Sequence, residues 1–142
     1  RLAGSERLDV LVHNVGVMLH GFTQTREGVE TSVATNLLCP FALTEGLQAS
    51  GVLDASSRII SVSSGGMYGA KLDLAALEAT EPAAHDGFMA YAQHKRAQAV
   101  LTRFWNDNAG PRAWVMHPGW VDTGGVRSSL PLFRKILRGV LR

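Results

Sequence analysis

Three short apolar runs, separated by long stretches of helical periodicity, constrain the fold of this chain more than any other feature. They cover residues 8–12, 58–63 and 113–116, and apolar side chains, many of them β-branched, predominate in each. Strands that alternate with long helices pair in parallel, because the crossover returns each strand in the same direction. The sequence therefore predicts an α/β fold: a doubly wound parallel sheet with helices on both of its faces.

The segments between these runs have the spacing of helices. We expect one helix from residue 29 to Gly51, capped by Thr25 and kinked or broken at Pro40, which has no N–H and crowds the preceding turn. A weak helix is expected over residues 72–77, a long one over 88–106, and a basic amphipathic one over 130–141. With no linker or internal repeat, residues 1–142 read as a single domain.

Composition excludes several classes of function. A net charge of +2 is too small to indicate a nucleic-acid partner. A single cysteine, Cys39, excludes a disulfide framework and a cysteine-based metal site, and the histidines lack metal-ligand spacing, so no metal is expected. No apolar run is long enough to span a membrane and no signal peptide is visible, so an intracellular, cytoplasmic protein is expected. The chain starts at Arg1, close to its first strand, and we expect it to be a piece of a longer protein.

Residues that are unusual in strands and helices follow each apolar run. Asn14 and Gly16 follow the first, Ser64 and two glycines the second, and residues 118–123 the third. In open parallel sheets, ligands bind outside the carboxyl ends of the strands. The sequence therefore predicts a binding site in these three loops.

Tyr91 and Lys95 are four residues apart in a helix-forming segment. Residues with this spacing share one face of a helix. An ammonium beside a phenol stabilises the phenolate, so we expect Lys95 to lower the pKa of Tyr91. A phenol tuned in this way can give and take a proton near neutral pH.

Five elements occur together in order: residues 13–16, Asn36, residues 62–64, Tyr91 with Lys95, and residues 118–123. With this set the sequence resembles the short-chain dehydrogenase/reductase family over essentially its whole length. The resemblance implies a partial Rossmann-like domain that holds the catalytic half. It also implies an NAD(P)-dependent oxidoreductase that transfers hydride between a nicotinamide and a carbonyl or alcohol, and a possible homo-oligomer.

The resemblance also assigns roles to residues. Tyr91 would be the acid/base, Lys95 would tune it and bind the nicotinamide ribose, and Ser64 would polarise the substrate carbonyl. Asn36 would hold a water that links Lys95 to solvent. The cofactor contacts it implies are Asn14, Gly16, Tyr91, Lys95, Pro118, Gly119, Val121 and Thr123. Together with Ser64, the candidate substrate contacts are Met67, Tyr68, Trp120 and Leu132, which are apolar enough to indicate a hydrophobic small molecule.

Several of these residues have a second interpretation. Ser63 is a rival to Ser64, although Ser63 belongs to the strand and we favour Ser64. Asn14 and Gly16 also fit simple turn chemistry. Asn36 is unfavourable in mid-helix, which indicates a specific role, but a hydrogen bond to backbone beside Pro40 would explain it equally. Residues 130–141 would be a substrate lid by resemblance, or else a basic surface helix.

The sequence departs from the family in its phosphate loop. No G-x-x-x-G-x-G follows a first strand, and the residue that separates NAD from NADP lies beyond that loop, so the choice of cofactor stays open. His13 stands where the family has an Asn. Three strands alone would leave a sheet edge unpaired and a face uncovered, so we expect these residues by themselves to be unstable or cofactor-free. The alternative function is a non-catalytic remnant or a partner-binding module.

Overall fold

A computed structural model describes residues 7–78, 85–108, 110–119, 131–136 and 139. Trp120, Val121 and Thr123 lie outside the described residues. The elements in chain order are β1 (Val10–His13), α1 (Thr31–Val33), the π-helix η1 (Ala34–Leu38), α2 (Cys39–Ala49), β2 (Arg58–Val62), the 3₁₀ helix η2 (Gly65–Gly69), α3 (Leu74–Leu77), α4 (Gly87–Asp107), β3 (Arg112–Met116) and α6 (Pro131–Ile136).

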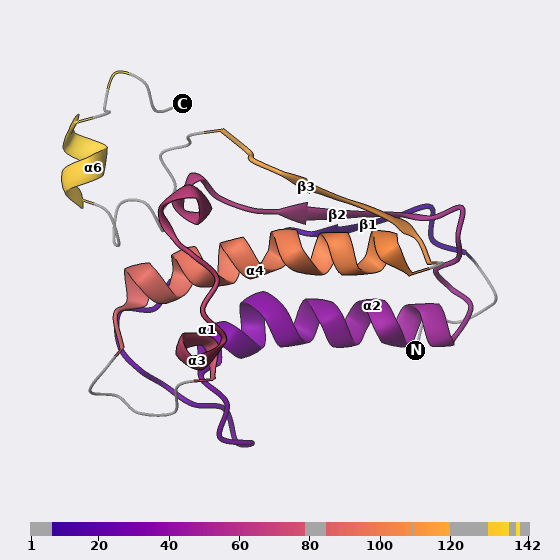
Figure 1. Cartoon of the computed structure of the whole chain (residues 1–142), viewed down its shortest axis with the longest axis horizontal. Coiled ribbons are helices and arrows are strands. Elements are labelled where there is room, and N and C mark those ends of the chain that lie inside the picture. Colours follow the sequence, from indigo (N-terminus) through magenta and orange to yellow (C-terminus); the bar gives the residue numbers. More distant parts are fainter. Residues whose placement is uncertain (1–6, 79–84, 109, 120–130, 137–138, 140–142) are drawn as a thin grey trace.

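The three apolar runs form one parallel sheet in the order β1-β2-β3. Val10 pairs with Arg58, which pairs with Arg112, and the register continues to Val62 beside Met116. The predicted partial α/β fold is therefore confirmed. Because all three strands run in one direction, their carboxyl ends lie at one edge of the sheet, where η2 follows β2 directly (Figure 1).

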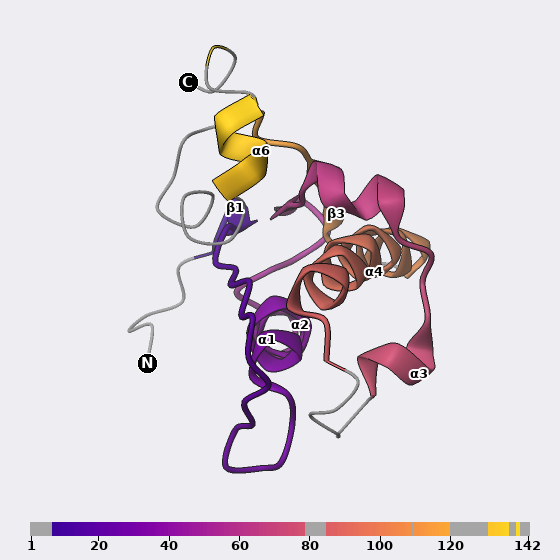
Figure 2. The same cartoon turned by 90° about the vertical axis from the view of Figure 1, so that its left-hand side faces the viewer.

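The two faces of the sheet differ. Figures 1 and 2 show α2 and α4 side by side against one face, which buries Ile59 and Ala113. On the opposite face Val12, Trp114 and Met116 are exposed. In the described part of the chain this second face is the uncovered face that we expect for three strands alone. An apolar strand face without a covering layer is incomplete as a core.

The helical region after β1 begins later and is less regular than expected. Glu30, and not Thr25, caps it: the Glu30 carboxylate accepts hydrogen bonds from the backbone N–H groups of Ser32 and Val33. The break expected at Pro40 takes the form of the π-helical segment η1, which ends just before α2, with Pro40 in the first turn of α2. Proline is tolerated there because the first turn has no intrahelical donor to lose.

The hydrophobic core lies between α4 and the sheet. Ile59, Trp105 and Ala113 form its buried centre, with Phe41 and Leu101 packed around it. Asp86 caps α4 by accepting from the N–H groups of Phe88 and Met89, and the Ser63 hydroxyl, directly after β2, donates to the Lys95 carbonyl of this helix. These contacts hold the side chains of α4 in register with the carboxyl end of the sheet.

The last described helix, α6, lies within the stretch expected over residues 130–141, whose other residues are outside the described part of the chain except for Gly139. Leu132 and Ile136 are about 70% and 72% exposed, so neither packs into the core. Within the described residues, no helix is both long and apolar enough to cross a membrane.

Candidate active site

Ser64, Tyr91 and Lys95 are brought together at the carboxyl end of β2. Ser64 follows the strand and caps η2, with its hydroxyl accepting from the Gly66 N–H at 3.3 Å. Tyr91 and Lys95 lie on the face of α4 that packs near this point, and the Lys95 Nζ is 5.5 Å from the centre of the Tyr91 ring. The predicted pairing of a phenol and an ammonium therefore exists in three dimensions.

Lys95 is a buried cation whose ammonium has neutral acceptors. It is only 3% exposed, and its Nζ donates to the Val62 carbonyl at 2.8 Å and to Gln98 Oε1 at 3.3 Å. Burial disfavours the charged form and lowers the pKa of Lys95 to about 8. The ammonium is thus still mostly charged at neutral pH but close to the point at which it can release a proton.

The expected lowering of the Tyr91 pKa is wrong for this arrangement. Burial raises the pKa of the phenol, and a side-chain hydrogen bond with Ser64 opposes that rise. The physical reason is desolvation, which disfavours the charged phenolate and outweighs the opposing hydrogen bond. Tyr91 is therefore a protonated phenol, suited to donate a proton to an oxygen placed beside it.

The two adjacent serines have different surroundings. The Ser63 hydroxyl is 4% exposed and donates to the Lys95 backbone carbonyl at 2.9 Å. It is also 3.3 Å from the Met67 sulfur. Ser63 therefore ties β2 to α4, while Ser64 is the serine that interacts with Tyr91. This division supports the preference for Ser64 as the residue that faces a substrate.

Asn36 fixes the loop that leaves β1. It is fully buried, and its side-chain amide accepts from the Val17 N–H at 2.9 Å and donates to the Val17 carbonyl at 2.8 Å. A pair of bonds to one backbone residue sets both the position and the orientation of that residue. Asn36 thus bonds to backbone, but at Val17 and not beside Pro40 as the alternative expected, and the water assigned to it by resemblance stays a prediction.

Gly16 lies directly against the side chains of Lys95 and Asn36. A β-carbon at Gly16 would be 3.2 Å from Lys95 Nζ and 3.4 Å from Asn36 Oδ1. Gly16 and Asn14 are both exposed, so the backbone at the end of β1 is open to a ligand while it touches the buried lysine. A glycine allows a close approach of this kind. The cofactor contacts that the resemblance implies for Asn14 and Gly16 stay predictions.

The other predicted contacts are less informative. Pro118 and Gly119 are exposed after β3, and Gly119 takes a positive φ of 81° while its N–H donates to His117 Nδ1 at 2.9 Å. Met67 is half-buried, and Tyr68 is 75% exposed. Only a glycine adopts the Gly119 backbone conformation without strain. The roles of these residues stay predictions.

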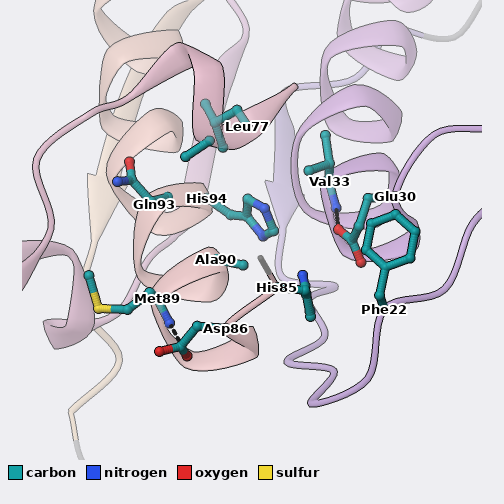
Figure 3. Close-up of a pocket in the computed structure, with 11 residues that line it drawn as sticks. Phe22, Glu30, Val33, Leu77, His85, Asp86, Met89, Ala90, Gln93 and His94 are labelled. Carbon is teal, nitrogen blue, oxygen red and sulfur yellow. Dashed lines mark hydrogen bonds between the residues drawn. The ribbon is translucent and has the colours of Figure 1, made fainter. Parts of the chain in front are cut away.

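A cavity of about 120 Å³ lies behind the site, on a different face of α4 (Figure 3). Figure 3 shows His94 and His85 on one side of it, with Glu30 and Phe22 across from them. His94 is 1% exposed, and its Nδ1 is 3.2 Å from Asn36 Nδ2. Burial lowers the pKa of His94 to about 4, against a small opposing effect of Glu30. His94 is therefore neutral at physiological pH.

Sequence reasoning missed three residues that complete the cluster: Val17, His94 and Gln98. Gln98 is 3% exposed and contacts both Lys95 and Asn36. Its position three residues after Lys95 places it on the same helix face, and this spacing was the signal that could have identified it. In the described part of the chain, no three His, Cys, Asp or Glu side chains cluster closely enough to hold a metal ion.

Comparison with known proteins gives the chain its relatives. No family model matches it. It is 44% identical over 137 residues to Dehydrogenase/reductase SDR family member 12 of Bos taurus, which covers 95% of this chain and 43% of the relative. It is 32% identical over 131 residues to Retinol dehydrogenase 12 of Homo sapiens, covering 90% of this chain and 41% of that protein. The chain thus spans about two fifths of the length of the curated relatives it matches.

Solved structures show the same fold. An uncharacterised protein from Mycobacterium paratuberculosis superposes with a TM-score of 0.67 at 28% identity, over 98% of this chain and 52% of the other. A short-chain dehydrogenase from Francisella tularensis superposes with a TM-score of 0.61 at 21% identity, over 95% of this chain and 50% of the other. The chain therefore covers about half of the length of these two structures.

Proposed function

Because this chain belongs to the short-chain dehydrogenase/reductase family, we propose that the intact protein is an NAD(P)-dependent oxidoreductase acting on a small carbonyl or alcohol. The observation that carries the proposal is the cluster of Ser64, Tyr91 and buried Lys95 at the carboxyl end of β2. A nicotinamide cofactor, when bound, supplies or accepts the hydride. The protein then has to position the substrate and move one proton.

We assign the proton to Tyr91. Its phenol is protonated at neutral pH, burial raises its pKa further above the ordinary value of 10.0, and it interacts with Ser64. A carbonyl oxygen placed between the two hydroxyls would accept a hydrogen bond from Ser64 and the proton from Tyr91. Positioned proton donors of this kind contribute roughly 10²–10⁴-fold to rate.

Lys95, Asn14 and Gly16 are assigned to the nicotinamide-ribose end of the cofactor. A ribose hydroxyl bound beside Lys95 would add an acceptor for the ammonium, whose present acceptors are Val62 and Gln98. The phosphate loop is absent from the sequence. No residue of the sequence is therefore assigned to the adenosine phosphates of the cofactor. The RMD protein from Pseudomonas aeruginosa, which has a related fold, was solved in complex with NADPH. The proposal for this protein covers both NAD and NADP.

The exposed sheet face favours the alternative function, a non-catalytic module, for residues 1–142 by themselves. Val12, Trp114 and Met116 offer apolar surface that a further layer would cover, so residues 1–142 alone are expected to bind no cofactor. A non-catalytic module remains the alternative function. Activity therefore has to be tested in the intact protein.

The test is the Tyr91→Phe variant of the intact protein, which removes one hydroxyl and keeps the ring. With a panel of hydrophobic aldehydes and ketones and either NADH or NADPH, turnover should fall by roughly 10²–10⁴-fold. Binding of the reduced cofactor, followed by its fluorescence, should be retained. Turnover at the wild-type rate in the variant would remove the role of Tyr91, and absence of both binding and turnover in the wild type would favour the non-catalytic alternative.

A further inference from the structure

Gln98 connects two parts of the site that no other described side chain joins. Its Oε1 accepts from Lys95 Nζ at 3.3 Å, and its Nε2 donates to the Asn36 backbone carbonyl at 3.0 Å. Gln98 is only 3% exposed, so neither end of its amide faces solvent. The backbone carbonyl of Gln98 accepts from Thr102 Oγ1 at 2.8 Å, within α4.

The orientation of this amide is set by its neighbours. A reversed amide would place its NH₂ against an ammonium and its oxygen against a carbonyl, and both contacts would be repulsive. In the observed orientation each end meets its complement: the oxygen meets the ammonium, and the NH₂ meets the Asn36 carbonyl. Gln98 therefore directs one lone pair at Lys95 with no second orientation available.

Pro40 removes one of the backbone donors that the Asn36 carbonyl could otherwise have. In an α-helix this carbonyl would accept from the N–H of the fourth residue on, which is Pro40, and proline has no N–H. A buried carbonyl without a donor costs free energy, and Gln98 provides one. The irregular segment η1 and the amide of Gln98 thus fit each other.

We propose that Gln98 is a positioning residue, which holds the Lys95 ammonium in place by bridging it to the Asn36 carbonyl. The proposal rests on the proposed function, because it concerns the lysine assigned to the cofactor and to Tyr91. Gln98 acts through Lys95 and touches no reacting atom. Without this bridge, the Lys95 ammonium keeps the Val62 carbonyl as its acceptor and loses its fixed direction.

Two variants of the intact protein separate the contacts. Gln98→Met keeps the length of the side chain and removes both hydrogen bonds, so the buried ammonium loses an acceptor. Gln98→Glu keeps an acceptor for Lys95, adds a negative charge, and removes the donor to Asn36. We expect the pKa of Lys95 to fall by about one unit or more with Met and to rise with Glu.

The readout is the titration of Lys95 in protein labelled with ¹³C at the lysine Cε, with the resonance assigned from a Lys95→Met sample. The wild type should titrate at about pH 8. Nearby titratable groups are Tyr91 and His94 on the same helix, while β2 and η1 contribute carbonyl oxygens and the Asn36 amide. Shifts of opposite sign for Met and Glu would not result from altered packing alone.

Gln93→Met is the matched control. Gln93 is on the same helix but at the cavity face, where its side chain accepts from the Asp73 N–H at 3.1 Å, so Lys95 should titrate as in the wild type. Equal titration of Lys95 in the wild type and in both folded Gln98 variants would overturn the proposal, as would an equal shift in the control. The titration needs no substrate, so a protein that reduces no carbonyl would overturn the proposed function while leaving this result readable.

Discussion

Two neighbouring ionisable residues on different faces of α4 are buried to almost the same depth, but one meets hydrogen-bond acceptors and the other a donor. Lys95 is 3% exposed and His94 is 1% exposed. Lys95 meets acceptors, the Val62 carbonyl and Gln98 Oε1. His94 meets a donor, the Asn36 Nδ2, whose orientation is fixed by its bonds to Val17. The contacts of Lys95 therefore suit a cation, and those of His94 suit a neutral ring.

Burial lowers the pKa of both residues by a similar amount, so their different charges follow from their ordinary pKa values, 10.5 for lysine and 6.5 for histidine, and the partners suit the form that results. Desolvation lowers the pKa of both residues, to about 8 for Lys95 and to about 4 for His94. At neutral pH these values leave the lysine charged and the histidine uncharged. At neutral pH the positive charge of Lys95 therefore lies on the side of α4 where Tyr91 is, and His94 adds no charge on the cavity side.

The largest expected effect comes from removing the charge on the Tyr91 side. Lys95→Met in the intact protein should lower turnover by roughly 10²–10⁴-fold, because the ammonium is lost from the site. Stability at pH 7 should change by no more than about 1 kcal/mol, since the variant also removes the cost of burying a charge. Steady-state kinetics and denaturant unfolding measure the two quantities.

The pH dependence gives this prediction a sign. The folded-state pKa of Lys95 is lowered from 10.5 to about 8, so the unfolded state binds more protons between these values. The free energy of unfolding should therefore rise with pH across this window in the wild type, and this rise should be absent in Lys95→Met. Lys71→Met, at an exposed position, should keep both the activity and the rise. Full activity in Lys95→Met would contradict the account.

A smaller effect is expected from the cavity side. The folded-state pKa of His94 is lowered from 6.5 to about 4, so the unfolded state binds the extra proton in this window. Stability should be lost as pH falls from 6.5 to 4, by about 3 kcal/mol at roughly 1.4 kcal/mol per pH unit. In His94→Gln this contribution should be absent, while activity at pH 7 is largely kept.

Two comparisons isolate His94 in that experiment. His13 also has its pKa lowered by burial, and it contributes to the same window in the wild type and the variant alike. His20→Gln, at an exposed position, should keep the wild-type dependence. An unchanged loss of stability at acid pH in His94→Gln would show that His94 does not carry the effect.

The sequence could predict whatever depends on local periodicity. The three strands, the long helix α4 and the shared face of Tyr91 and Lys95 follow from spacings of two to four residues, and all are present. The irregular helix at Pro40 also follows from a local rule, the missing proline N–H. Glu30 as the cap in place of Thr25 was missed, because a glutamate is a less usual choice for that position.

The sequence could not predict contacts between distant segments. The hydrogen bond from Gln98 to Asn36 spans 62 positions, and Asn36 bonds to Val17 across 19 positions. The expected lowering of the Tyr91 pKa failed for the same reason, since this pKa is set by burial and by a hydrogen bond with the distant Ser64. The contacts of His13, which stands where the family has an Asn, are also between distant segments. Its ring hydrogen-bonds to Thr44 Oγ1 at 2.8 Å and stacks on Trp105, so His13 is part of the core.

The most direct test of the account is to observe both charges in one sample of the intact protein. A single preparation labelled with ¹³C at lysine Cε and with ¹⁵N in the histidine rings would be followed from pH 4 to pH 10. The account predicts that at pH 6 His94 is neutral and Lys95 is charged, with Lys95 losing its proton near pH 8. A His94 ring protonated at pH 6, or a Lys95 that titrates near its ordinary value of 10.5, would contradict it.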